Sequence, residues 1–178
     1  MTTYLKAGIL GGLVLFFWGY VSWMYLPWHS MTLHRFTDEK AVSQVIQANA
    51  PHSGVYLSPM SAISATTQSA QPQPMLFVSA HLQGMSSMVQ AMMVSILIQF
   101  FSAILVAWML CRTKLSYLGR LGFVEVFALT VGIVAYLPGW NWFKIDTLYT
   151  LVNMADLLVG WFLAGLLLAW ICKCKEVA

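Results

Sequence analysis

Among the polar side chains inside the long apolar stretches of the sequence, four are the strongest candidates for chemistry. They are two carboxylates, Asp156 and Glu125, and two amides, Asn153 and Gln99. A carboxylate at the centre of a bilayer costs several kcal/mol, so it normally faces the interior of a helix bundle or another subunit. Asn153 and Asp156 share a helix face, and Gln99 is expected to meet them across the bundle. We therefore predict an intramembrane polar network of Asp156, Asn153, Gln99 and Glu125.

This network has two interpretations, as hydrogen bonds that hold helices together or as a polar path for a proton or an ion. The two carboxylates are at different depths. Glu125 is roughly 9 Å from one surface and Asp156 roughly 12 Å from the other, so we do not expect a catalytic dyad. Glu125 is close enough to Arg120 and Arg112 in the sequence for pairing at the interface.

Small residues recur at helical spacing and predict close helix contacts. Gly8, Gly12 and Gly19 follow one side of the first apolar stretch, and Gly160 and Ala164 repeat the pattern in the last one. Spacings of four residues between small side chains allow two helix backbones to approach closely. These faces are expected to form either a groove within one chain or the seam of a homo-oligomer.

Metal-binding and catalytic patterns are weak in this sequence. The four histidines, His29, His34, His52 and His81, lie in one polar segment but lack the spacing of a compact metal site. The serines and histidines of this segment have no acid placed to complete a triad, and there is no phosphate-binding loop or nucleophile elbow. We predict no catalytic residue, no metal site and no cofactor, and hence a protein that is not an enzyme.

Four apolar stretches must position these residues, at about 7–26, 86–111, 120–138 and 148–172. Each is long enough to cross a hydrocarbon core of about 30 Å as a helix. Hydrophobic residues make up 60% of the chain and charged residues only 8%, which excludes an ordinary soluble domain. The prediction is an all-α integral membrane protein, a single four-transmembrane-helix bundle over residues 1–178. The short links 112–120 and 139–147 predict that the second, third and fourth helices are antiparallel neighbours in order.

Basic residues predict the orientation of the bundle. Six of them flank the membrane on the side that holds both ends of the chain: Lys6, Arg112, Lys114, Arg120, Lys173 and Lys175. The positive-inside rule therefore gives an N-in/C-in topology, and the compact loops favour a bacterial inner membrane. On this side the thiols of Cys111, Cys172 and Cys174 are expected to stay reduced, without a disulfide. The net charge of +3 is small and scattered, which argues against nucleic-acid binding.

The segment at about 28–84 is expected to form a small α+β extracytoplasmic insertion between the first two helices. Residues 37–49 have the apolar spacing of an amphipathic helix, with Thr37 as its N-cap. Two β-type runs, 55–57 and 75–82, are expected to pair as an antiparallel hairpin, because a lone strand leaves its backbone unsatisfied. Residues 61–74, rich in Ser, Thr and Gln, are expected to be a loop.

Three functions are compatible with these features. The leading one is a non-enzymatic accessory, assembly or oligomerising subunit, in contact with the lipid bilayer and with a second copy or another membrane protein. The first alternative is a channel or transporter component with a polar path through Asp156, Asn153 and Gln99. The second is an extracytoplasmic metal-handling or redox membrane protein that uses the histidines.

Overall fold

The computed structural model describes residues 2–60, 74–84 and 87–173, and long helices dominate it. They are α1 (Thr3–Met24), α3 (Met88–Leu110), α4 (Tyr117–Phe143) and α5 (Thr147–Ile171). Within the described residues, these four helices are long and apolar enough to cross a membrane. The expectation of four helices of membrane-spanning length and composition is confirmed.

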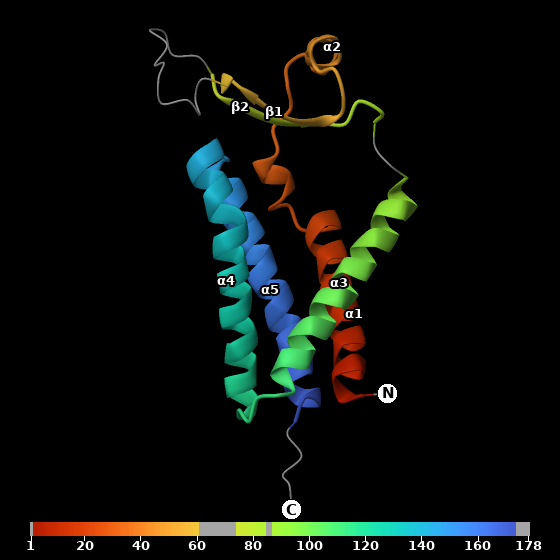
Figure 1. The fold of residues 1–178 in the computed structure, drawn as a ribbon, viewed down its shortest axis with the longest axis vertical. Coiled ribbons are helices and arrows are strands. Elements are labelled where there is room, and N and C mark those ends of the chain that lie inside the picture. Colours follow the sequence, from red (N-terminus) through yellow and green to blue (C-terminus); the bar gives the residue numbers. More distant parts are fainter. Residues whose placement is uncertain (1, 61–73, 85–86, 174–178) are drawn as a thin grey trace, which may run out of the picture.

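The helices form an open bundle in which α1 and α5 are central. α1 packs against α3 on one side and α5 on the other, and α4 packs against α5. The described ends of the chain lie together at one end of the bundle, which we call the terminal end; the inserted segment lies at the opposite end, the cap end (Figure 1). α3 crosses α1 and diverges from α4 and α5 towards the cap end (Figure 1). α3 and α4, which the short link predicts to be antiparallel neighbours, share few contacts, and the main neighbour of α3 is α1.

Glycines explain why α3 packs on α1. A Cβ atom added to Gly8 would lie 2.5 Å from the Cα atom of Ile104, and one added to Gly12 would lie 2.8 Å from the Cα atom of Phe100. The two helix backbones therefore approach more closely than any larger residue would allow. A short link makes two helices antiparallel, but it does not supply this contact surface.

The core lies towards the terminal end. α3 contributes Ala103, Val106, Ala107 and Leu110 to it, all from its second half. Arg120 is also buried here, and it donates hydrogen bonds to the carbonyl oxygens of Ala169 at 2.8 Å and Leu115 at 2.6 Å. This guanidinium ties the start of α4 to the end of α5.

α4 continues past the predicted stop at Pro138 and ends at Phe143. A proline removes one helical hydrogen bond, here to the carbonyl of residue 134, but it need not end a helix. Pro138 and Val134 are both exposed, so the freed carbonyl lies on the outer side of α4 near its end. The link to α5 is therefore only 144–146, and Lys144 makes the turn in the left-handed region at φ 53°.

The cap comprises η1 (Ser30–Thr32), α2 (Glu39–Asn49), β1 (Gly54–Ser58) and β2 (Leu76–Ala80). The predicted hairpin is confirmed: β1 and β2 are antiparallel, with Tyr56 opposite Val78. The N-cap of α2 is Asp38 rather than Thr37, because the Asp38 carboxylate accepts the Ala41 N–H at 2.8 Å. Phe77 of β2 stacks on Phe143 of α4, with ring centroids 4.3 Å apart, and this contact connects the cap with the bundle. Most of the predicted loop 61–74 lies outside the described residues.

Cys111 and Cys172 form a disulfide in this structure, so the expectation that no disulfide joins the cysteines is wrong. Cys111 follows α3 and Cys172 follows α5, and their Cα atoms are 4.8 Å apart. This separation is within the range of ordinary disulfides. The sequence places both residues at helix ends on one side of the membrane, but only the packing of the helices makes them neighbours.

Candidate functional site

A buried polar cluster near the cap end joins α1, the turn after it and α5. We call it the Asp156 cluster; its members are Trp18, Ser22, Trp28, His29 and Asp156. Trp18 and Ser22 are four residues apart and share one face of α1. Asp156 lies about 14 Å along α5 from Thr147, at 1.5 Å per residue. The one His–carboxylate contact among the described residues therefore lies in the half of the bundle towards the cap end.

The Asp156 carboxylate is held from three sides. Its Oδ1 accepts hydrogen bonds from Trp18 Nε1 at 2.7 Å and from Ser22 Oγ at 2.6 Å. Its Oδ2 lies 3.5 Å from His29 Nε2. Trp18 Nε1 also lies 3.1 Å from the Asp156 backbone oxygen. These contacts supply the partners that a carboxylate needs when it is removed from water.

The hydrogen bonds assign the proton on His29. Ser22 has one hydroxyl proton, which it donates to Asp156, and its oxygen accepts from Trp28 Nε1 at 3.0 Å. His29 Nε2 lies 3.1 Å from this oxygen and close to Asp156 Oδ2, both of which accept hydrogen bonds. Nε2 must therefore be the protonated ring nitrogen. The other ring nitrogen, Nδ1, is buried and has no hydrogen-bond partner in the described part of the chain.

Aromatic rings enclose this cluster. The Trp23 ring stacks on the His29 ring with centroids 3.9 Å apart and planes 9° from parallel, and Trp28 meets His29 edge-on. His29 is 2% exposed and Ser22 is fully buried, whereas Asp156 keeps 18% exposure. Electrostatic interactions strengthen in such a low-dielectric environment, so the contacts between α1 and α5 are strong ones.

Ser, His and Asp are also the residue types of a nucleophilic triad, but their geometry differs from one. In a triad the histidine contacts the serine through one nitrogen and the acid through the other. Here Nε2 faces both Ser22 and Asp156, and the serine donates its proton directly to the acid. With Ser22 fully buried, the geometry supports a structural or proton-binding cluster rather than a nucleophile.

The structure gives Asp156 partners other than those predicted. Asn153 donates to the Tyr149 carbonyl at 2.7 Å, one turn back on its own helix. Gln99 makes no hydrogen bond within the described residues. Glu125 has a buried Oε1 atom without a partner there, and neither Arg120 nor Arg112 pairs with it. Arg120 donates to backbone carbonyls, and Arg112 lies over the Trp108 ring, 3.7 Å from its centroid.

The small residues that the sequence analysis grouped on helix faces contact different parts of the bundle. Gly8 and Gly12 face α3, and Gly160 faces Trp18, whose Cδ1 atom would lie 2.9 Å from an added Cβ. Ala164 is fully buried in the core, while Gly19 has open space around its Cα hydrogens. The Gly8 and Gly12 face is thus a groove within one chain.

The other histidines lie apart from this cluster. His34, His52 and His81 are exposed in the segments that flank the helices and strands of the cap. Among the described residues, no group of three or more His, Cys, Asp or Glu side chains converges in the way a metal site requires.

The sequence analysis missed Trp18, Ser22, Trp28 and His29 as partners of Asp156. Ser22 and Asp156 are 134 residues apart, so their contact depends on the packing of α1 against α5. One local signal was present, since Trp18 and Ser22 are polar groups four residues apart in an otherwise apolar helix. Such a stripe indicates that this face meets a polar partner.

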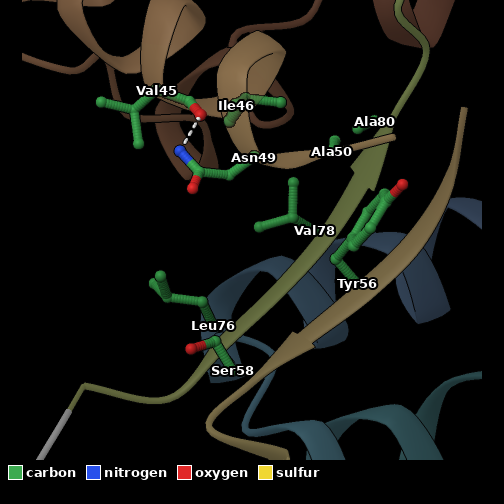
Figure 2. A pocket seen from close by; sticks show the side chains of 9 residues that line it. All are labelled: Val45, Ile46, Asn49, Ala50, Tyr56, Ser58, Leu76, Val78 and Ala80. Atoms are coloured by element: carbon green, nitrogen blue, oxygen red, sulfur yellow. Dashed lines mark hydrogen bonds between the residues drawn. The ribbon is translucent and has the colours of Figure 1, made fainter. Parts of the chain in front are cut away.

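The cap contains a separate apolar cavity of about 260 Å³ between α2 and the two strands. Figure 2 shows Val45, Ile46 and Asn49 on one side and Tyr56, Leu76 and Val78 on the other. The Asn49 amide is already bonded to the Val45 carbonyl at 2.8 Å. The lining therefore offers apolar surface but no converging charged groups.

No family model, curated protein or solved structure matches this chain. The function must therefore be argued from the Asp156 cluster, the exposed faces of the helices and the cysteine pair.

Proposed function

We propose that this chain is a non-enzymatic accessory or assembly subunit, whose contact surface in the membrane is the outer half of α3. The observation that supports this proposal is the Gln99 amide. Gln99 lies at the midpoint of α3 and makes no hydrogen bond within the described residues. An amide in hydrocarbon strongly favours a hydrogen-bonding partner, and lipid tails cannot provide one.

Gln99 is half-buried, and the part of α3 that precedes it is uncovered. From Met88 to Ile98 every residue of α3 is exposed except Ile96, which is half-buried. Gln99 lies on the same face as Val106 and Leu110, which are buried against the rest of the bundle closer to the terminal end. α3 diverges from α4 and α5 towards the cap end, where these helices leave it without a neighbour other than α1 (Figure 1). A transmembrane helix of a second copy or of another protein fits this surface.

The Asp156 cluster supports a structural rather than a conducting role. Its serine and histidine are buried, and its hydrogen bonds join α1 to α5. In this proposal the cluster fixes the outer half of α1, and α3 remains available for the partner.

The proposal includes an orientation and a location. Lys6, Arg112, Lys114 and Lys173 lie at the terminal end, and the cap end carries fewer basic residues. By the positive-inside rule the terminal end is cytoplasmic and the cap faces the periplasm of a bacterial inner membrane.

Replacement of Gln99 tests the assembly function. In mild detergent, native mass spectrometry of the wild-type chain is expected to show a homo-oligomer or a complex with another membrane protein. Gln99→Leu should lower the association constant about tenfold, because interhelical hydrogen bonds of this kind contribute about 1–2 kcal/mol in model peptides. Thr130→Val is the matched control, since Thr130 is exposed on α4 and its hydroxyl bonds to its own helix at 2.8 Å. A wild-type monomer without a copurifying protein would contradict the proposal.

A second candidate, a proton-coupled channel or transporter component, is favoured by one observation. Asp156 Oδ2 lies 3.5 Å from His29 Nε2, so a carboxylate and an imidazole share a buried site at which a proton can reside. For this function, Asp156→Asn should abolish proton flux into proteoliposomes while the purified variant keeps its helical circular dichroism spectrum. Equal flux with the wild-type and Asp156→Asn chains would rule it out.

A further inference from the structure

The disulfide between Cys111 and Cys172 lies at the terminal end of the bundle, the end with the larger basic charge. With this end in the cytoplasm, accessible thiols are kept reduced for most of the time. We propose that Cys111 and Cys172 form a reversible dithiol–disulfide pair, a redox-modification site that ties α3 to α5 when it is oxidised. This inference goes beyond the assembly function and shares with it only the orientation.

The two sulfurs differ in access. Cys172 is 1% exposed, whereas Cys111 is half-buried, so reagents reach Cys111 first. In its reduced form each cysteine reacts as the thiolate, which is the nucleophile in thiol–disulfide exchange.

The exchange needs a small disulfide as oxidant, such as an oxidised low-molecular-weight thiol. The Cys111 thiolate attacks one sulfur of this disulfide, forms a mixed disulfide and releases one small thiolate. The Cys172 thiolate then attacks the Cys111 sulfur, forms the Cys111–Cys172 bond and releases the second. Two protein thiols are oxidised by two electrons, the small disulfide is reduced to two thiols, and the two protons pass to the released thiolates.

The disulfide would restrict the position of α3 more than that of the other helices. α3 makes few contacts with α5 or α4, and its main neighbour is α1. The disulfide therefore fixes the end of α3 next to α5, while the outer half of the same helix is uncovered. A helix of 23 residues is about 35 Å long, so a small rotation at the Cys111 end moves the Gln99 face and the cap end further.

Thiol trapping in cells tests the pair. Cells that express the full chain with Cys174→Ser, which leaves only these two cysteines, are quenched with acid, and free thiols are tagged with a polyethylene glycol maleimide. We expect two tags per chain in untreated cells, none after a thiol-oxidising diazene, and two again after dithiothreitol. The Cys111→Ser and Cys172→Ser variants in this background should carry one tag in untreated cells. After the oxidant, Cys172→Ser should retain a small thiol bound to Cys111 and lose its tag, and dithiothreitol should restore it.

Two results would overturn the inference. In the first, the chain carries no tag in untreated cells and none after dithiothreitol treatment of native membranes, which would mean a permanent structural disulfide. In the second, the chain still carries two tags after the oxidant, which would mean that the two cysteines do not pair.

The orientation is measured separately with Gln44→Cys, an exposed position in α2, in a chain lacking the native cysteines. Labelling of this residue by an impermeant maleimide on spheroplasts supports a cytoplasmic terminal end, and protection overturns the inference. The proposed assembly function is tested by the native mass of the Gln99→Leu variant, so its failure can be distinguished from failure of the redox pair or of the orientation.

Discussion

Gly8→Leu is expected to separate α1 from α3 and to lower the free energy of unfolding by about 2–4 kcal/mol, near or above the usual range for overpacking. The new Cβ atom would lie 2.5 Å from the Cα atom of Ile104 and 2.8 Å from its backbone nitrogen. Backbone atoms cannot rotate away as a side chain can, so the helices themselves must move. The measurement is thermal or SDS-induced unfolding of the purified chain in mild detergent, followed by circular dichroism.

Gly19→Leu provides a matched control on the same helix. Apart from its chain neighbours and the backbone of its own helix turn, no atom lies within 4 Å of an added Cβ at Gly19, so this variant should unfold within about 0.5 kcal/mol of the wild type. Equal loss of stability at both positions would show that leucine is harmful anywhere along α1. Unchanged stability of Gly8→Leu would show that α1 and α3 do not cross at Gly8.

The sequence predicts where the helices lie along the chain better than it predicts which helices pack together. A membrane helix needs about 20 apolar residues, and that requirement can be read from the chain without knowledge of its packing. The cap hairpin is also a local feature, because β-type runs and turn residues determine where its strands begin and end. α3 illustrates the limit, since its short link to α4 predicts a neighbour, whereas Gly8 and Gly12 bring it to α1.

The Asp156 cluster could be predicted only in part for the same reason. The cost of a carboxylate in hydrocarbon predicts that Asp156 is buried against polar groups, but it does not identify them. By residue type, Gln99 and Ser22 are equally suitable hydrogen-bond donors to Asp156. Which of them meets Asp156 depends on whether α3 or α1 packs against that face of α5. The disulfide depends on packing as well, because Cys111 and Cys172 are 61 residues apart.

The two intramembrane carboxylates are expected to respond in opposite ways to replacement by leucine. Asp156→Leu removes the acceptor of Ser22 at 2.6 Å and of Trp18 at 2.7 Å, and it leaves His29 without its carboxylate. Buried donors without acceptors are costly, so we expect a loss of about 2–4 kcal/mol. Asp156→Asn retains one acceptor oxygen and should lose about half as much, since an amide can still accept from Trp18 or Ser22.

Glu125→Leu is the contrasting variant, because the Glu125 Oε1 atom is buried without a hydrogen-bond partner in the described part of the chain. Removing that carboxylate removes the cost of burying it away from water and breaks no hydrogen bond within the described residues. The variant should therefore be as stable as the wild type or more stable. Unfolding of both variants in detergent measures the contrast, and Ser22→Ala combined with Asp156→Leu measures the coupling within the cluster. The double variant should lose less than the sum of the single losses, since both changes remove the same hydrogen bond. Additive losses, or equal effects of Asp156→Leu and Glu125→Leu, would mean that the cluster does not join α1 to α5.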